Sequence, residues 1–531
     1  MATPWWQGAV IYQIYPRSFF DSNGDGVGDL PGVTRKLDYV AALGVDGIWL
    51  SPFFVSPMRD FGYDVADYRA VDPIFGGEDD FDALVARAHA LGLKVVIDQV
   101  YSHTSDRHPW FSESRSGPDN PRSDWYVWAD PRPDGAPPNN WLSVFGGPAW
   151  SWDTQRRQYY LHNFLAEQPD LNFHQPAVQS AILDVARFWL DRGVDGFRLD
   201  VANYYFHDAA LRDNPPSGVV NGLRPYHFQD HRYNRSRPET LAFLARLREA
   251  VDAYDACMTV GEIFSAAPIE RSMAYVDGDD RLHTAYNFLF LEAQAVSPDL
   301  IRKGVSAWTS ETAWPSWSFS NHDVERVLSR WGAEGAGAPA AKAFFALLCS
   351  LRGTAFVYQG EELGLVQGNV PFDKLRDPEA VRFWPETLGR DGCRTPMPWR
   401  AGRPHAGFSS AEPWLPVDPR HEAAAVDAQS GDPQSCLSFA QGFLAFRRAH
   451  AALRVGSIRF LDAADPVLLF ERRTHQQRLY CGFNLSAEPH ALPAAALQTG
   501  FRLTGCGLRA DAIGDAIVMP PYGGFIAEAT A

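Results

Sequence analysis

Charged side chains stand at the ends of several short apolar segments of this chain. Asp98 closes one segment, and Asp200 closes another, two residues after Arg198. Glu262 closes a third, and a further polar cluster occupies Asn321–Asp323. Two carboxyl groups held about 5–5.5 Å apart can cleave a glycosidic bond with retention, one as nucleophile and one as proton donor. These residue types, held at strand ends, therefore predict glycoside hydrolysis.

The surroundings of each carboxyl group suggest its role. We expect Asp200 to be the nucleophile, because Arg198 shares its strand face and would keep it ionised. Glu262, as acid/base, needs a raised pKa, which a dry apolar pocket would provide. Asp323 would stabilise the oxocarbenium-like transition state. The alternative for any single residue is an ordinary loop carboxylate or helix cap, but this explanation does not account for the whole set.

The elements that must position these residues alternate between strands and helices. Apolar strand segments are Ala9–Tyr15, Val45–Phe53, Leu93–Val100, Val194–Val201, Met258–Ile263, Thr284–Leu291, Trp317–Ser320 and Thr354–Gln359. Helical periodicity occupies Arg35–Leu43, Phe81–Leu91, Val178–Arg192 and Glu239–Tyr254. This order predicts an α/β fold with parallel strands. Because no GxGxxG turn follows the first strand, a (β/α)8 TIM barrel is favoured over an open sheet.

Irregular composition marks the predicted domain boundaries. Residues 1–104 and 173–453 form the predicted barrel, with an irregular insertion at about 364–432 that is rich in Pro, Arg and Asp. Residues 105–172, after the third strand, are too long for a barrel loop and predict a small inserted domain B. Residues 454–531 alternate between apolar and polar positions, which predicts a C-terminal antiparallel β domain.

Composition and charge exclude several classes of function. The 531 residues carry 64 acidic and 48 basic side chains, a net charge of −16. This balance disfavours nucleic acid and anionic membrane surfaces as partners. No signal peptide or transmembrane segment is expected, and the six cysteines are scattered without CxxC spacing. Reduced thiols predict a cytoplasmic protein. The oligomeric state is not encoded in any recognisable pattern.

A loop near the N-terminus could bind a hard cation. The segment DSNGDGVGD offers side-chain oxygens and one main-chain carbonyl, from Asp21, Asn23, Asp25, Val27 and Asp29. Such dense oxygen donors suit a structural Ca²⁺ or Mg²⁺. The loop is not a helix–loop–helix hand, because its twelfth position is Gly32. The alternative is a metal-free Asp/Asn/Gly turn. No organic cofactor is expected.

The motifs around these residues resemble those of glycoside hydrolase family 13, the α-amylase family. The resemblance rests on DQVYSH (98–103), GFRLDVAN (196–203), VGEIF (260–264) and FSNHD (319–323). The segments QPDLN (168–172), YQGEELG (358–364) and GRDGCRTPMPW (389–399) look like the oligo-1,6-glucosidase branch. The resemblance implies that Asp200, Glu262 and Asp323 are the nucleophile, the acid/base and the transition-state stabiliser. It also implies an ion in the Asp21–Asp29 loop.

The resemblance further implies a closed substrate pocket. It implies that substrate is bound by the following residues: Asp60, Tyr63, His103, Phe145, Phe164, Gln168, Arg198, His322, Arg390 and Arg394. Tyr63 would stack on the glucose ring, and Asp60 would accept its hydroxyls. Either Arg390 or Arg394 would pair with Asp60 and close the pocket. Ser102 departs from the family pattern, which carries a calcium-ligating Asn there, so no calcium is expected at that position.

A closed pocket predicts an exo-acting α-glucosidase for short α-glucosides of the maltose, isomaltose and sucrose class. The alternative is a transglucosylase, or an isomerase of the sucrose type, which uses the same covalent intermediate. Val201, directly after the proposed nucleophile, accompanies 1,6 preference in this branch, which is a hint rather than a rule. A non-catalytic scaffold is disfavoured, because all three carboxylates are present.

Overall fold

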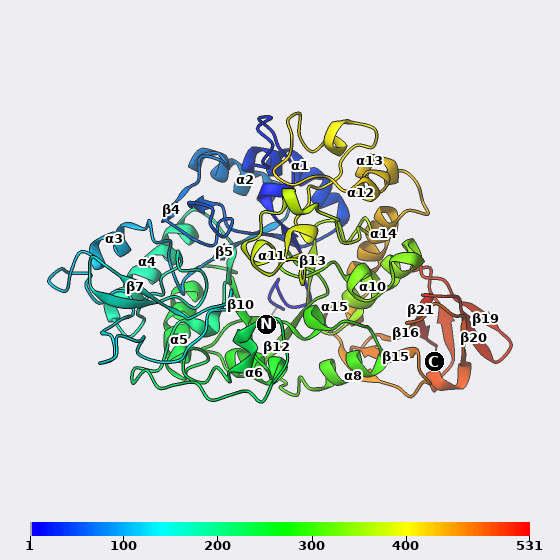
Figure 1. The fold of residues 1–531 in the computed structure, drawn as a ribbon. Helices are drawn as coiled ribbons and strands as arrows, with labels where there is room; N and C mark the ends of the chain where they lie inside the picture. The colour runs from blue at the N-terminus through cyan, green and yellow to red at the C-terminus, as the bar shows by residue number, and fades with distance from the viewer. Residues whose placement is uncertain (1–2, 531) are drawn as a thin grey trace.

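The computed structural model describes residues 3–530, and its centre is a closed eight-stranded parallel barrel. The strands follow the order β1-β13-β12-β11-β10-β9-β5-β2. Their bounds are β1 (Val10–Ile14), β2 (Gly47–Leu50), β5 (Lys94–Gln99), β9 (Gly196–Leu199), β10 (Met258–Ile263), β11 (Thr284–Asn287), β12 (Trp314–Ser318) and β13 (Thr354–Tyr358). These eight strands are buried along nearly their full length, as both faces of such a barrel are covered. The predicted TIM barrel is therefore confirmed (Figure 1).

Helices cover the barrel between its strands. The main ones are α1 (Leu30–Leu43), α2 (Glu78–Ala90), α4 (Pro176–Asp191), α5 (Glu239–Asp252), α6 (Pro268–Val276), α8 (Pro298–Ser306), α10 (Ala338–Ser350) and α14 (Cys436–Ala449). Local signals explain their ends: Asp29 caps the start of α1 by accepting a hydrogen bond from the Gly32 amide, and Gly44 ends it with φ +89°. Among residues 3–530, no helix has the length and apolar character needed to cross a bilayer.

Most of the predicted strands differ from the observed ones by a few residues at their ends, and two of these differences have a local explanation. The sixth was expected to continue to Leu291, but β11 ends at Asn287. The Asn287 side chain accepts the Leu289 amide at 3.2 Å, and the short helix α7 (Leu289–Glu292) starts there. An amide side chain that binds the following backbone favours a helix start over a continued strand. The seventh strand begins at Trp314 instead of Trp317, because Pro315 is tolerated close to the start of a strand.

Two antiparallel units flank the barrel at opposite sides of Figure 1. Within the segment 105–172, helix α3 (Pro109–Ser114) precedes a three-stranded sheet in the order β6 (Trp128–Ala129), β8 (Gln158–Leu161), β7 (Trp150–Asp153). After α15 (Ala451–Val455), a five-stranded sheet contains β14 (Ser457–Phe460), β15 (Val467–Arg473), β16 (Arg478–Asn484), β21 (Gly524–Ala529) and β18 (Phe501–Leu503). A second sheet of β17 (His490–Pro493), β20 (Ala516–Met519) and β19 (Asp511–Ile513) packs on it. The C-terminal antiparallel β domain is thus confirmed.

The irregular stretch after β13 holds only short helices: α11 (Pro378–Phe383), α12 (Pro419–Ala423) and α13 (Val426–Gln429). A hairpin of β3 (Phe54–Val55) and β4 (Asp67–Val71) follows β2, and α9 (Val327–Arg330) follows β12. These connections all leave the C-terminal ends of the barrel strands, where a TIM barrel builds its active site. All six cysteines are free thiols, and only Cys257 is not fully buried.

Candidate active site

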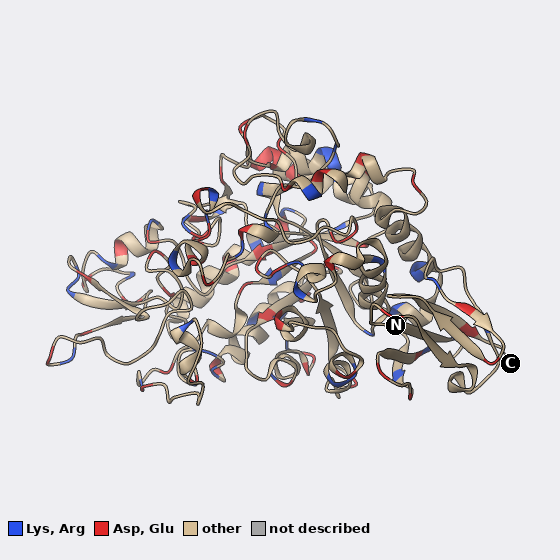
Figure 2. Cartoon of the chain, turned by 45° about the vertical axis from the view of Figure 1, so that its right-hand side comes forward, with Lys and Arg blue, Asp and Glu red and all other residues tan. Residues whose placement is uncertain are grey.

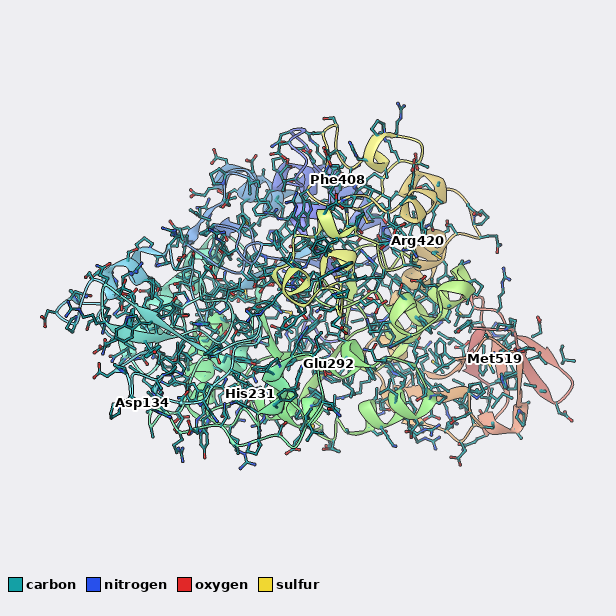
Figure 3. All side chains as sticks on the ribbon, in the orientation of Figure 1. Asp134, His231, Glu292, Phe408, Arg420 and Met519 are labelled. Carbon is teal, nitrogen blue, oxygen red and sulfur yellow. The ribbon has the colours of Figure 1, made fainter. Side chains whose placement is uncertain are left out.

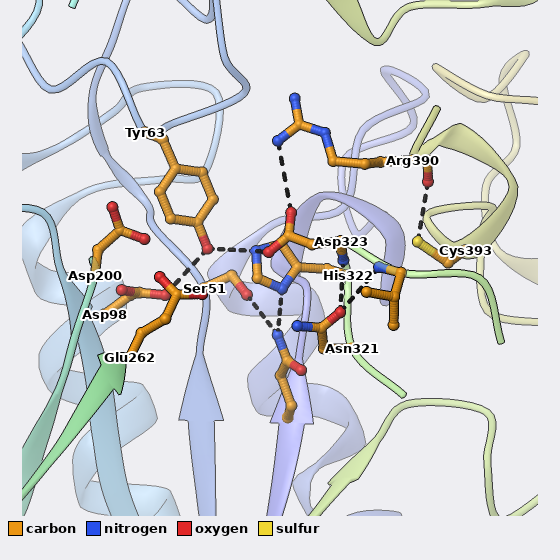
Figure 4. A network of polar contacts seen from close by, with 12 residues as sticks. Ser51, Tyr63, Asp98, Asp200, Glu262, Asn321, His322, Asp323, Arg390 and Cys393 are labelled. Atoms are coloured by element: carbon orange, nitrogen blue, oxygen red, sulfur yellow. Dashed lines mark hydrogen bonds and ion pairs between the residues drawn. The ribbon is translucent and has the colours of Figure 1, made fainter. Parts of the chain in front are cut away.

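One buried arginine gathers the carboxyl groups that the strands carry. Arg198, in β9, is 1% exposed and places one guanidinium nitrogen 2.8 Å from Asp98 and 2.6 Å from Asp200. Its other terminal nitrogen lies 2.6 Å from Glu262, in β10. Figure 4 shows the three carboxyl groups next to one another, below the ring of Tyr63. Parallel strands end at one rim of the barrel, so residues distant in sequence meet there.

Burial separates the proton affinities of these groups. It raises the pKa of Glu262 to about 8, against the lowering effect of Arg198. It also raises the pKa of Asp200 to about 7, and Asp98 adds to that rise. We expected Arg198 to hold Asp200 fully ionised, but this cation is shared among three carboxylates and only partly offsets burial. Glu262 nevertheless has the higher pKa, so a single proton resides on Glu262 more than on Asp200.

The third carboxylate has the opposite environment. Asp323 is contacted by Arg394 at 2.8 Å, by the His322 ring at 3.2 Å and by Arg390 at 3.5 Å. Burial opposes ionisation of Asp323, but the charged groups around it lower its pKa well below the ordinary range. Asp323 is therefore anionic over the whole physiological range and can stabilise positive charge that develops nearby.

A strained backbone links the two predicted catalytic residues. Val201, directly after Asp200, has φ +35° and ψ +50°, a region that β-branched residues rarely adopt. Its amide donates a hydrogen bond to Glu262 at 2.9 Å. Strain of this kind persists only where the surroundings enforce it, and it is concentrated at active sites. The turn therefore holds Glu262 in place relative to Asp200.

A hydrogen-bonded chain fixes Tyr63 in the wall of the site. The Gln13 amide contacts Nδ1 of His322 at 2.7 Å, and Nε2 of that ring lies 2.5 Å from the Tyr63 hydroxyl. The Tyr63 hydroxyl donates to Asp98 at 3.1 Å. The two rings stack, with centroids 5.4 Å apart and planes 10° apart. Burial lowers the pKa of His322 to about 3, so the imidazole is neutral at physiological pH.

An ion pair forms part of the wall of the site. Arg390 contacts Asp60 at 2.7 Å and Asp377 at 2.8 Å. This geometry answers the open choice between the two arginines: Arg390 pairs with Asp60, while Arg394 pairs with Asp323. Gln168 donates to Asp60 at 3.2 Å and contacts the His103 ring at 3.1 Å. The amide, the carboxylate and the guanidinium thus form a continuous polar wall.

These groups surround a cavity of about 630 Å³, the size range of small-ligand sites. Ten of the thirteen predicted catalytic and substrate-binding residues line it: Asp60, Tyr63, His103, Phe145, Phe164, Gln168, Asp200, Glu262, Asp323 and Arg390. The remaining three, Arg198, His322 and Arg394, are at most 1% exposed and lie behind this lining, in contact with its carboxylates. The guanidinium of Arg390 lies 5.2 Å from the centre of the Phe145 ring.

The outer part of the cavity contains residues that the motifs did not reveal. Arg224 and Glu379 form an ion pair that joins the loop after β9 to α11. Phe264 and Phe288 pack edge to face, with centroids 5.3 Å apart. Glu292, labelled near the centre of Figure 3, also lines the cavity. The two phenylalanines directly follow β10 and β11, but a search for charged residues at strand ends passes over them, and nothing in the sequence marked Arg224 and Glu379.

The predicted metal loop is folded around its own acidic side chains. Asp21 accepts hydrogen bonds from the amides of Asn23, Gly24 and Gly26, and Asp29 caps α1. Among residues 3–530, no cluster of three or more Asp, Glu, His or Cys side chains has the arrangement of a metal site. The donors are nevertheless all oxygens, and no Lys or Arg of this range forms an ion pair with them. Their chemistry fits a hard cation.

Ser102, which stands where the family motif has Asn, forms a hydrogen bond with the neighbouring histidine. The Ser102 hydroxyl lies 2.8 Å from Nδ1 of His103. Burial lowers the pKa of His103 to about 4, so this ring is neutral and can hydrogen-bond a sugar hydroxyl.

Comparisons with known proteins agree with this geometry. Residues 13–456 match the family profile described as the catalytic domain of α-amylase. A protein of Rhizobium meliloti named "Probable alpha-glucosidase" is 51% identical over 99% of this chain and 97% of its own. An oligo-1,6-glucosidase of Heyndrickxia coagulans is 40% identical over 91% of this chain and 92% of its own.

Solved structures of related enzymes also superpose on this chain over its full length. The α-glucosyl transfer enzyme XgtA superposes with a TM-score of 0.96 at 53% identity and covers 100% of both chains. The trehalulose synthase MutB of Pseudomonas mesoacidophila MX-45 superposes with a TM-score of 0.91 at 32% identity, again over 100% of both chains. The chain therefore belongs to the α-amylase family, glycoside hydrolase family 13, and within it to the α-glucosidase class of glycoside hydrolases.

Proposed function

We propose that this protein is a retaining, exo-acting α-glucosidase that removes one α-glucose from the non-reducing end of a short α-glucoside. One observation carries the proposal. The cavity that exposes Asp200 and Glu262 is also lined by Asp60 and Arg390, which pair at 2.7 Å and are largely buried, and we infer that this pair closes one end of it. A sugar chain cannot pass through a closed end, so only a terminal residue reaches the carboxylates.

The proposed reaction has two steps. First, a carboxylate oxygen of Asp200 bonds to the anomeric carbon while the bond to the leaving oxygen breaks. Glu262, whose higher pKa keeps it protonated, gives its proton to that leaving oxygen. Second, Glu262 takes a proton from water, the water oxygen bonds to the anomeric carbon, and the ester to Asp200 breaks. Asp323 stabilises the positive charge that develops in both steps.

Neutral hydrogen-bonding groups and one aromatic ring would orient the glucose. His103 and Gln168 face the cavity from one wall and Tyr63 from the next. These groups are buried and have little access to water. A sugar whose hydroxyls form hydrogen bonds with them is therefore bound more tightly than a sugar that leaves them without a partner. We propose that Asp60 accepts the hydroxyls of this terminal glucose, since its carboxylate has capacity beyond its bond to Arg390.

The second candidate is glucosyl transfer to an alcohol or a sugar. It is favoured by the similarity to XgtA, an α-glucosyl transfer enzyme, and to a trehalulose synthase. The outer cavity adds a structural reason: Phe264, Phe288 and Leu388 form apolar lining where an acceptor would approach. An apolar surface at that place holds water weakly and can hold the carbon skeleton of an acceptor.

Product analysis separates the two candidates. Purified protein is incubated with maltose, isomaltose or sucrose, with and without added alcohol. Free glucose as the sole new glucose-containing product would establish hydrolysis, whereas a new glucoside as the main product would establish transfer. The Asp200→Ala variant is the control. If it released the chromophore of an aryl α-glucoside as fast as the wild type, the covalent mechanism would be refuted.

We also propose that the loop formed by Asp21, Asn23, Asp25, Val27 and Asp29 binds a structural Ca²⁺ or Mg²⁺. The support is the all-oxygen donor set and the absence, within residues 3–530, of any ion pair from Lys or Arg to these residues. The ion would hold the chain between β1 and α1 and would take no part in the reaction.

A further inference from the structure

A second cavity lies at the opposite end of the barrel from the carboxylates. Its volume is about 640 Å³. Arg302 and Ser306 of α8 line one side, and Ser457 and Arg459 of β14 line the other. Its floor is the start of β12 and the residue Arg352, two positions before β13. The cavity is therefore built between the N-terminal ends of the barrel strands and the C-terminal β domain.

Three arginines, Arg302, Arg352 and Arg459, line this cavity, and two of them have no carboxylate partner among residues 3–530. Within residues 3–530, Arg302 and Arg352 are both half-buried and donate no side-chain hydrogen bond and form no ion pair. The Arg352 guanidinium lies 4.7 Å from the centre of the Trp314 ring, which fixes its plane. Arg459 has one carboxylate partner, Glu471, at 3.2 Å. The single acidic side chain in the lining, Glu311, is exposed and contacts none of the three.

More positive charge lies directly behind the cavity. Arg472 and Arg447 are at most 3% exposed, and both bind main-chain carbonyls instead of carboxylates. Burial, together with the neighbouring cations Arg447 and Arg352, lowers the pKa of Arg472 to about 9. Basic and acidic residues are otherwise interspersed over the molecule (Figure 2), and the net charge is −16. A group of arginines with so few counter-charges is therefore a local excess of positive potential.

We propose that this cavity binds an oxyanion of the phosphate class, held by Arg302, Arg352 and Arg459. The guanidinium group matches phosphate geometry with two parallel N–H donors, and such charge-assisted bonds are the strongest hydrogen bonds in proteins. The hydroxyls of Ser306 and Ser457 add donors. The site is concave and of small-molecule size, and the acidic chain repels polyanions such as nucleic acid. A phosphate ion or a phosphorylated sugar is therefore the favoured occupant.

Equilibrium binding of defined probes tests this proposal. Inorganic phosphate and glucose 6-phosphate are titrated separately into the full-length protein, up to tens of millimolar, by calorimetry and by ³¹P NMR. We expect saturable one-to-one binding that weakens by about tenfold or more in the Arg302→Ala/Arg352→Ala variant. Tighter binding of glucose 6-phosphate than of phosphate would identify a phosphorylated sugar, and equal binding would identify the free ion.

Two controls make the test decisive. Arg187→Ala removes an exposed arginine on α4 that pairs with Asp184, and it should leave phosphate binding unchanged. Cleavage of an aryl α-glucoside shows that each variant is folded, and Arg302→Ala alone serves if the double variant is not. Absence of saturable binding to the wild type, or equal binding by the double variant, would overturn the proposed site. Neither outcome bears on the glucosidase proposal, whose residues lie at the other end of the barrel.

Discussion

Glu262→Gln should remove one limb of the pH profile and leave the other. The productive form of the wild-type site has Asp200 ionised and Glu262 protonated. With pKa values of about 7 and about 8 for these groups, kcat/KM should follow a bell with its maximum between them. The two values belong to an interacting pair, so the limbs report the pair and not isolated residues.

These pKa values give the expected magnitudes. At the maximum, about 0.6 of the free enzyme carries the productive proton arrangement, and at pH 5 about one hundredth does. The acidic loss arises because Asp200 becomes protonated as pH falls through its pKa. The alkaline loss arises because Glu262 loses the proton that it must donate. Glutamine resembles the protonated, uncharged form of Glu262, so it should leave the pKa of Asp200 unchanged.

The assay compares two substrates with different leaving groups. A nitrophenyl α-glucoside expels its aglycone without proton donation, whereas methyl α-glucoside needs it. We expect Glu262→Gln to lower kcat/KM about 10²- to 10⁴-fold more for the methyl glucoside than for the nitrophenyl glucoside. The alkaline limb that the wild type shows with methyl α-glucoside should be absent from the variant with either substrate, and the acidic limb should remain. An alkaline limb that persists in the variant, or an equal loss for both substrates, would refute the assignment of the acid.

Three further perturbations test other parts of the molecule. Asp60→Asn should raise KM for maltose about tenfold or more by weakening hydroxyl binding, which steady-state kinetics measures. Arg390→Met should lower the free energy of unfolding by about 3–5 kcal/mol, because it leaves buried carboxylates without their cation. Denaturant unfolding measures this loss, and an equal free energy of unfolding in both variants would contradict the ion-pair argument. Arg224→Ala and Glu379→Gln should each increase the ratio of hydrolysis to transfer in the presence of an alcohol, because loss of their ion pair admits water to the outer cavity, and chromatography of the products shows whether the ratio moves. Chelation by EDTA should lower the melting temperature of the wild type but not that of Asp21→Ala, and the same shift in both proteins would remove the case for an ion in that loop.

Residues at strand ends were predictable from the sequence, because a strand's termination is marked by a change from apolar to polar side chains. Asp200 and Glu262 both stand at such a change, and both line the cavity. Strand bounds were less certain where side chains interact locally. Asn287 ends β11 by binding a backbone amide two residues on, an event that hydrophobic periodicity does not reveal.

Pairings across the cavity required the fold. The choice between Arg390 and Arg394 as the partner of Asp60 depends on the path of the loop that follows β13, which short helices and irregular backbone determine. The same holds for the pKa of Asp200. The sequence places one arginine beside it, but only the structure shows that Arg198 also serves Asp98 and Glu262. Long-range contacts of this kind leave no periodic signal in either partner.

Closure of the barrel also has a consequence for synthesis of the protein. Strand β1 pairs with β13, so Val10 meets Ala355. During synthesis, strand β1 therefore lacks its partner β13 until about two thirds of the polypeptide has emerged from the ribosome. Until then the nascent chain has an open sheet edge and incomplete coverage of its acidic centre, a state prone to mispairing with other chains. Slow translation or chaperone contact before residue 358 would thus affect the yield of native protein more than the same event later.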